Sequence, residues 1–185
     1  AEELGGGMRN PDIAPVTTRD GREVQLGNDP SVMPGPETTY QSYGIPWANV
    51  SNTPFRLYKH WVHEGGISTP FIVHWPDRVM DKGAFREQPG QLTDVMATCL
   101  DVAGAEYPET FNGHDILPLE GTSLASIFDD RDNGKEFLIW EHEGNGAVRK
   151  GKWKLVKRYP GEWELYDIEA DRSELNNVVS EHSDV

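Results

Sequence analysis

The sequence predicts an α/β body followed by a small antiparallel sheet. An unbroken apolar run at residues 69–75 is typical of a strand that is buried on both faces. Residues 92–103 carry apolar side chains at helical spacing. After residue 136, short runs rich in aromatic and β-branched residues are separated by glycine turns, as in an antiparallel meander. We therefore expect residues 1–135 to be the incomplete end of an α/β domain and residues 136–185 to be a small antiparallel subdomain.

The composition restricts the partners that this chain can bind. Its 185 residues include 31 acidic and 17 basic side chains, which give a formal net charge of −14. Nucleic acids and anionic membranes require a basic face, so we expect neither as a partner. A single cysteine, Cys99, rules out an internal disulfide, and no apolar run is long enough to span a membrane. Because the chain opens on Ala-Glu-Glu, we expect a fragment or a processed chain.

The first third of the chain shows little periodic pattern. The chain has 19 glycines and 13 prolines, and residues 1–51 contain several turn-forming clusters of them. We expect this segment to wrap a larger body or to line a site. Thr53-Pro54 then resembles a helix start, which predicts a short helix through Tyr58 that leads to Lys59.

The helix predicted at residues 92–103 has one apolar face and ends before Gly104, a suitable C-cap residue. Cys99 lies on this face, so we expect it in the core and not as a nucleophile. A shorter helix is predicted at residues 124–128. The residues expected to form the apolar face are Leu92, Val95, Met96, Cys99, Leu100 and Ala103.

The meander has four predicted strands, at residues 137–142, 147–150, 152–158 and 162–168. Alternation along them predicts one buried face and one basic, solvated face that includes Lys154. The buried face is expected to carry Trp140, Trp153, Leu155 and Trp163.

Lys59 and the Glu64-Gly65-Gly66 turn are the leading candidates for a site. Only glycine lets backbone segments approach closely, so the turn would hold the lysine at the mouth of a strand. There Lys59 could bind a tetrahedral anion and neutralise developing charge, or it could be an ordinary solvated lysine. We expect Glu64 to accept backbone N–H groups of the glycine turn, or to pair with Lys59.

Histidines provide the remaining candidates. His60, His63 and His74 could hold a metal, but no acid or cysteine completes a recognised spacing, so packed or hydrogen-bonded histidines are the default interpretation. His142 lies in a polar cluster at the end of a predicted strand, which is typical either of a pocket rim or of a turn. The sequence contains no complete set of nucleophile, base and orienting group.

Several motifs resemble sulfatases of the arylsulfatase type. The segment from Lys59 to Pro70 is similar to the Lys, four residues, Glu-Gly-Gly pattern near the end of their catalytic domain. Four further segments match in order: Leu92–Thr98 with Asp-x-x-x-Thr, His114–Leu124 with Gly-x-Ser-Leu, Trp140–Leu155 with the C-terminal subdomain, and Glu164–Asn177 with Glu-Leu-Tyr-Asp and Glu-x-x-Asn.

The resemblance implies an alkaline-phosphatase-like α/β domain that hydrolyses sulfate esters, with Lys59 holding a sulfate oxygen and His142 at the pocket rim. It also implies a formylglycine nucleophile, made in a Cys/Ser-x-Pro-x-Arg motif, and a calcium or other divalent cation. That motif is missing, since residues 52–56 begin with Asn and residues 68–72 lack the Arg. We therefore expect nucleophile and metal ligands outside this chain, and no activity from the chain alone.

The resemblance further implies two partners: a small-molecule or saccharide sulfate ester, and the N-terminal part of the same enzyme. Ala1-Glu2-Glu3 is similar to residues that follow the family's Asp-Asn metal ligands, and Gly146 stands where we expect arginine in relatives. Two other functions remain open: a phosphodiester or phosphonate hydrolase of the same superfamily, and a non-catalytic binding module. A panel of sulfate and phosphate esters, assayed with the full-length protein, would test the first of these functions. A thermal melt of the isolated chain would test whether it folds alone, as a binding module should.

Overall fold

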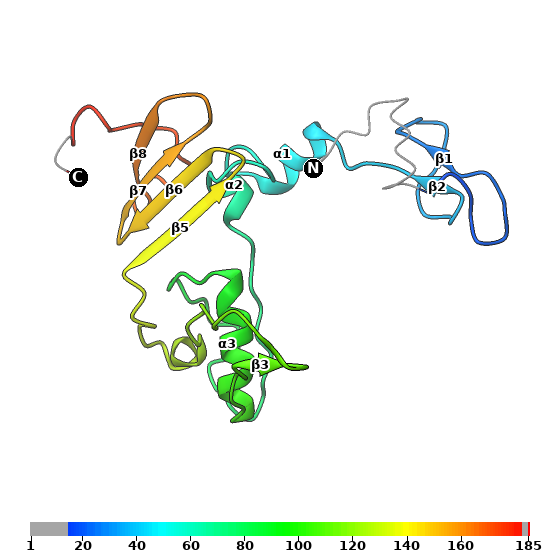
Figure 1. The fold of residues 1–185 in the computed structure, drawn as a ribbon. Coiled ribbons are helices and arrows are strands. Elements are labelled where there is room, and N and C mark those ends of the chain that lie inside the picture. The colour runs from blue at the N-terminus through cyan, green and yellow to red at the C-terminus, as the bar shows by residue number, and fades with distance from the viewer. Residues whose placement is uncertain (1–14, 183–184) are drawn as a thin grey trace. The chain divides into compact units, whose positions relative to one another are not determined.

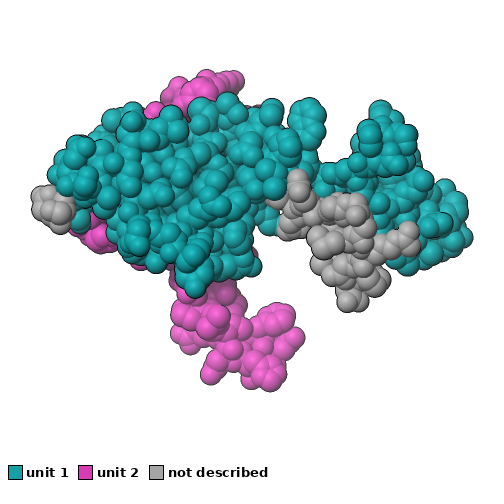
Figure 2. Space-filling model, turned by 90° about the horizontal axis from the view of Figure 1, so that it is seen from above, with its two compact units in different colours: residues 1–69, 140–147, 152–185 teal, residues 70–139, 148–151 magenta. Residues whose placement is uncertain are grey.

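The structure, a computed structural model, describes residues 15–182 and 185, and it combines short helices with small sheets (Figure 1). Ala1-Glu2-Glu3 lies outside the described residues. The chain forms two compact units: unit 1 comprises residues 1–69, 140–147 and 152–185, and unit 2 comprises residues 70–139 and 148–151 (Figure 2). Within the described part of the chain, no helix is long and apolar enough to cross a membrane. The predicted division at residue 136 stays a prediction.

The elements follow one another as β1 (Gln25–Leu26), β2 (Thr39–Tyr40), α1 (Ile45–Asn52), α2 (Glu64–Ile67), α3 (Leu92–Ala103), β3 (Thr110–Phe111), β4 (His114–Asp115), the 3-10 helix η1 (Ala125–Asp129), β5 (Phe137–His142), β6 (Asn145–Lys150), β7 (Trp153–Lys157) and β8 (Trp163–Asp167).

Residues 15–63 are mostly irregular, as their turn-forming residues predict, apart from the parallel β1–β2 pair and helix α1. The helix predicted from Thr53 to Tyr58 is wrong, because Thr53 is the C-cap of α1 and the next helix, α2, begins only at Glu64. Helix α1 begins earlier, with Pro46 in its first turn, where proline is favoured. The chain therefore reaches Lys59 through an irregular loop.

The sheet β5–β6–β7–β8 matches the predicted strands, and β7 and β8 pair antiparallel with Leu155 opposite Leu165. The predicted faces are wrong. Lys154 and Val156 are fully buried, whereas Trp163 is exposed. Tyr166 lies opposite Lys154 in the register and is buried as well. The reversal follows from a charge cluster in the core, described below.

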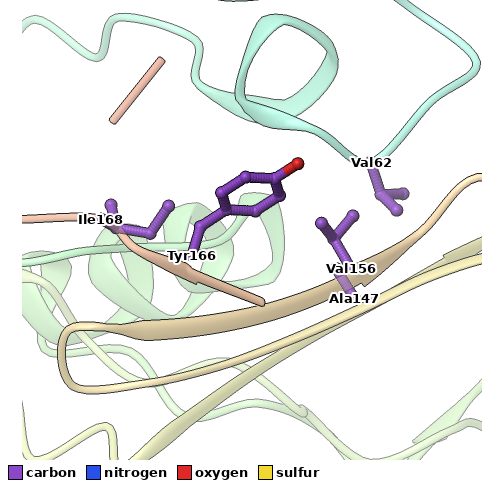
Figure 3. Close-up of a cluster of buried hydrophobic side chains, with 5 residues drawn as sticks. All are labelled: Val62, Ala147, Val156, Tyr166 and Ile168. Carbon is purple, nitrogen blue, oxygen red and sulfur yellow. The ribbon is translucent and has the colours of Figure 1, made fainter. Parts of the chain in front are cut away.

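The core of unit 1 connects this sheet to the segment after Lys59. Val62 extends from that segment toward Val156 and Tyr166 of the sheet (Figure 3). Ala147 and Ile168 complete the buried cluster, and Ile67 and Trp140 pack against it. Each large apolar side chain buried here contributes about 1.5–3 kcal/mol. The segment that carries Lys59 is therefore anchored to the sheet by ordinary hydrophobic packing.

Unit 2 contains the two predicted helices. Helix α3 spans Leu92–Ala103 and ends at Gly104, whose φ of 60° is the left-handed conformation of a C-cap glycine. Helix η1 lies at the second predicted position. The predicted face of α3 is wrong: Asp94, Ala97 and Thr98 are buried, and the predicted apolar face is largely exposed. Leu92 is 88% exposed, and Cys99 is exposed instead of in the core.

The strand predicted at residues 69–75 is also wrong for this chain. These residues have no regular structure, and every side chain among them is exposed, Ile72 to 88%. A strand of this composition needs hydrogen-bonded neighbours and a cover on both faces. Among the described residues, no strand pairs with this run. The apolar pattern is that of a buried strand, but the described residues do not bury it.

Candidate functional site

Lys59 lies exposed in a loop whose backbone is strained on both sides. Leu57 has a φ of 67° and His60 a φ of 100°, in the region that residues with a Cβ rarely occupy. Such conformations cost about 1–3 kcal/mol each, and they persist only where the surroundings hold them. We define residues 57–61 as the lysine loop.

Hydrogen bonds fix three carbonyl groups of the lysine loop. The Asn52 amide donates to the carbonyl oxygens of Leu57, at 3.0 Å, and of Gly65, at 2.7 Å. The Trp61 N–H donates to the carbonyl of Tyr58 at 3.2 Å. The Asn145 amide donates to the carbonyl of His60 at 3.2 Å, and Asn145 is only 1% exposed. The loop is therefore held from α1 on one side and from the sheet on the other.

The two glycines lie against the same loop, as their position predicts. A Cβ on Gly65 would lie 2.3 Å from the carbonyl oxygens of Arg56 and Leu57, and one on Gly66 would lie 1.9 Å from that of Trp61. No side chain fits at these distances. The glycine N–H groups donate to the carbonyls of Arg56 and His63, so the expectation that Glu64 accepts them is wrong.

Glu64 instead belongs to a buried charge cluster. Its carboxylate accepts hydrogen bonds from Lys154, at 2.9 Å, and from Arg172, at 3.2 Å. The Lys154 ammonium also lies 2.8 Å from Glu174 Oε1, an ion pair whose alignment falls short of a hydrogen bond. Glu174 Oε2 accepts the backbone N–H of Glu64 at 2.8 Å. Lys154, Glu64 and Glu174 are all buried, so these three charges are balanced by one another, by Arg172 and by the backbone N–H of Glu64.

These contacts determine the charge state of Glu64. Burial by itself raises the pKa of a carboxyl group, but the ion pairs with Lys154 and Arg172 outweigh it and lower the pKa of Glu64 below its usual value. Glu64 is therefore ionised near neutral pH. Its negative charge is what allows Lys154 to lie in the core, where the sequence pattern predicted a solvated lysine.

A second polar network surrounds Arg56. The guanidinium donates to the Tyr166 hydroxyl at 3.0 Å and to the carbonyl of Glu174 at 2.8 Å. The Tyr166 hydroxyl donates to Glu164 at 2.6 Å, and burial together with this bond raises the pKa of Tyr166. Arg56, the arginine of the segment at residues 52–56, therefore makes structural contacts with Tyr166 and Glu174.

The histidines have different roles. His63 is fully buried, its Nε2 lies 3.2 Å from Glu164, and burial lowers its pKa. This agrees with a hydrogen-bonded histidine. The described residues offer a single group of three metal-type ligands, and it consists of His60, His142 and Glu143, not of the three histidines considered from the sequence. His142 is exposed at the end of β5, and its role in substrate binding stays a prediction.

A family comparison decides the identity. Residues 55–184 match the sequence profile of the N-sulphoglucosamine sulphohydrolase C-terminal family. The chain belongs to the sulfatases, and it carries their C-terminal domain. An uncharacterized sulfatase of Schizosaccharomyces pombe is 31% identical over 77% of this chain and 27% of its own length.

Two further proteins extend the comparison. The N-acetylgalactosamine-6-O-sulfatase of Bacteroides thetaiotaomicron is 27% identical over 72% of this chain and 29% of its own length. The crystal structure of Ps i-CgsB superposes with a TM-score of 0.55 at 28% identity, covering 71% of this chain and 29% of that one. The chain thus spans somewhat over a quarter of the length of these curated sulfatases.

In the second half of the chain, side chains of the sulfatase motifs hold the backbone through hydrogen bonds. Asp94 and Thr98 of the Asp-x-x-x-Thr motif accept the backbone N–H groups of Thr122 and Leu124, at 2.9 and 2.8 Å. Glu174 of the closing motif binds the backbone of Glu64.

Sequence reasoning missed the buried roles of Lys154, Asn145 and Glu174. The local pattern gave no signal for Lys154, because assigning its neighbours Trp153 and Leu155 to the core places Lys154 on the opposite, solvated face of the strand.

Proposed function

We propose that the sulfatase containing this chain hydrolyses saccharide sulfate esters, and that Lys59 binds the sulfate group. One observation carries the role of Lys59: it occupies a strained loop that is held by a side chain from α1, by the sheet and by the glycine pair. Holding a strained loop costs stability, and proteins retain such strain mainly at functional sites. The similarity to the Bacteroides N-acetylgalactosamine-6-O-sulfatase supports the substrate class.

The chemistry expected of Lys59 is electrostatic. A lysine ammonium is a compact positive charge with three donors, suited to the oxygens of a tetrahedral anion. Its side chain is exposed and therefore within reach of a substrate. Because the loop is fixed in advance, little reorganisation is needed when negative charge develops on the sulfate oxygens.

The cofactors that the resemblance implies do not fit the residues present. Calcium takes oxygen ligands, whereas the one group of potential ligands among the described residues contains two imidazoles. The only cysteine, Cys99, is followed by Leu100 and not by the pattern of a formylglycine site. We propose that both are provided by residues other than 1–185.

His142 and Gly146 are proposed to face the part of the substrate beyond the sulfate. His142 is exposed at the end of β5, and Gly146 follows in the next strand. A Cβ on Gly146 would be in ordinary contact, 3.4 Å from the Trp163 ring, so the position tolerates a side chain. The glycine would leave the pocket rim more open than an arginine would.

A panel of sulfate and phosphate esters tests this proposal. The chain of residues 1–185 alone is expected to show no turnover, and a longer sulfatase that includes it is expected to hydrolyse sulfated saccharides in preference to phosphate esters. Preference for phosphodiesters or phosphonates would favour the second hydrolase function. Saccharide binding by the chain without turnover by the longer protein would favour a binding module. Turnover by residues 1–185 alone would contradict the proposal that the nucleophile and the metal are provided by other residues.

A further inference from the structure

Three side chains of metal-ligand type converge next to the lysine loop. His60 Nδ1 lies 2.9 Å from a carboxylate oxygen of Glu143, and the rings of His60 and His142 have their centroids 5.6 Å apart. One ligand atom from each of these residues lies within 4.8 Å of the others. We propose that His60, His142 and Glu143 form a binding site for a divalent transition metal such as Zn²⁺, and we call it the His-His-Glu site.

The backbone under these side chains is fixed by a single buried residue. The Asn145 amide donates to the carbonyls of both His60, at 3.2 Å, and His142, at 2.9 Å. Its own oxygen accepts the Tyr159 N–H at 3.0 Å, which fixes the orientation of the amide. Asn145 is 1% exposed. The two histidines come from segments more than 80 positions apart, and one amide holds both in place.

The turn between β5 and β6 places the third ligand. Glu143 and Gly144 both have positive φ, 52° and 83°, the combination found in the two central residues of a tight hairpin turn. Glu141 accepts the Gly144 N–H at 2.9 Å and so supports that turn. Glu143 therefore follows His142 at a defined position instead of on a long free loop.

The ligand set identifies the class of metal. Imidazole nitrogen is a preferred ligand of Zn²⁺, Cu²⁺, Ni²⁺ and Fe²⁺, and two histidines with one carboxylate form known sites for zinc and non-haem iron. Ligand atoms around a tetrahedral zinc are about 3.3 Å apart, given metal–ligand bonds of about 2.0–2.1 Å. The side chains of His60 and Glu143 are 45% and 63% exposed, so they can close by the remaining distance and leave positions open to water or a ligand. Calcium, which takes oxygen ligands, does not suit this set.

A metal titration of the purified, untagged protein tests the site. Isothermal titration with Zn²⁺ is expected to give one equivalent, and Co²⁺ is expected to give the visible absorption of a nitrogen- and oxygen-ligated ion. Excess Ca²⁺ should compete with neither. The variants His142→Ala and Glu143→Gln should each weaken Zn²⁺ binding by at least about tenfold, the lower end of what even a supporting group contributes at metal sites. His114→Ala is the matched control, because His114 is an exposed histidine of unit 2, and it should bind like the wild type.

Circular dichroism of each variant shows whether it is folded. If one is not, histidine ring resonances of the wild type during Zn²⁺ addition provide the second test, with shifts expected for two rings. Failure of the wild type to bind one equivalent, wild-type affinity in both the His142→Ala and the Glu143→Gln variant, loss of binding in His114→Ala, or ring shifts confined to other histidines would each overturn the proposal. Because these readouts do not involve ester hydrolysis, the outcome is independent of the proposed function.

Discussion

The two units bury their polar groups in a similar way but differ in what they do with apolar residues. Unit 1 encloses Lys154 between two carboxylates, and unit 2 encloses Asp94 beside Lys135, at 2.6 Å. Unit 1 also has a buried apolar cluster that includes Val156, whereas in unit 2 the apolar face of α3 and the run at residues 70–75 leave Leu92 and Ile72 each 88% exposed. Residue pattern alone does not separate these cases. Burial of an apolar face depends on whether a covering layer is present, and in unit 2 the described residues do not provide one.

The largest effect is expected at Lys154. Replacing it in Lys154→Met leaves Glu64 and Glu174 buried without their shared cation, and breaking a buried pair costs about 3–5 kcal/mol of unfolding free energy. Urea unfolding followed by tryptophan fluorescence measures the loss. Lys152→Met is the matched control, since its ion pair with Asp167 is partly exposed and is worth at most about 1 kcal/mol. Equal losses in the two variants would show that the charge cluster does not stabilise unit 1.

Asp94 is expected to have the next largest effect, and it lies in unit 2. Its carboxylate accepts the N–H groups of Gln91 and Thr122 and pairs with Lys135. Asp94→Asn keeps the shape, removes the charge and should cost about 2 kcal/mol. Asp101→Asn, at an exposed bond to Ser123, is the control and should cost under about 1 kcal/mol. A loss of unfolding free energy in Asp94→Asn no larger than that in Asp101→Asn would indicate that the contacts of Asp94 do not stabilise unit 2.

A pair of apolar truncations addresses the comparison of the units directly. Val156→Ala removes two methyl groups from a fully buried side chain and should cost about 2 kcal/mol. Leu92→Ala removes more atoms from an 88% exposed side chain and should change stability by under about 0.5 kcal/mol. Both are read from the same urea titration. A large loss for Leu92→Ala would mean that the apolar face of α3 is covered in solution.

The smallest expected effect is a pH dependence from His63. Burial lowers the pKa of His63 from 6.5, so the unfolded chain binds a proton in a pH range where the folded chain does not. The stability that depends on neutral His63 is therefore present above pH 6.5 and is lost as the pH falls toward the lower pKa of the folded state. His63→Gln should flatten the stability profile just below pH 6.5. The lowered carboxylate pKa of Glu64 acts in a more acidic range, below 4.5. An unchanged profile in His63→Gln would contradict this assignment.

Local signals predicted part of the elements correctly, although the helix expected at Thr53–Tyr58 and the strand expected at residues 69–75 were wrong. The strands of the sheet, helix α3 with its Gly104 cap and the need for glycine at positions 65 and 66 were all confirmed. These features depend on a few neighbouring residues.

Features that depend on distant partners could not be predicted. Lys154 is buried only because Glu64 and Glu174, 90 positions before it and 20 after it, meet it in the core. The face of α3 and the strand at residues 69–75 were assigned to a core that residues 15–182 do not complete. The meeting of His60 with His142 and Glu143 likewise arises only from the fold.

The sulfate-binding role of Lys59 is the central proposal, and one rate measurement tests it most directly. In a longer sulfatase containing these residues, Lys59→Ala should lower the rate of sulfate ester hydrolysis by roughly 10²-fold or more, as for the loss of one group that stabilises developing charge. Lys82→Ala, at an exposed lysine of unit 2, should leave the rate unchanged. A Lys59→Ala variant that is folded and turns over at the wild-type rate would remove Lys59 from the mechanism.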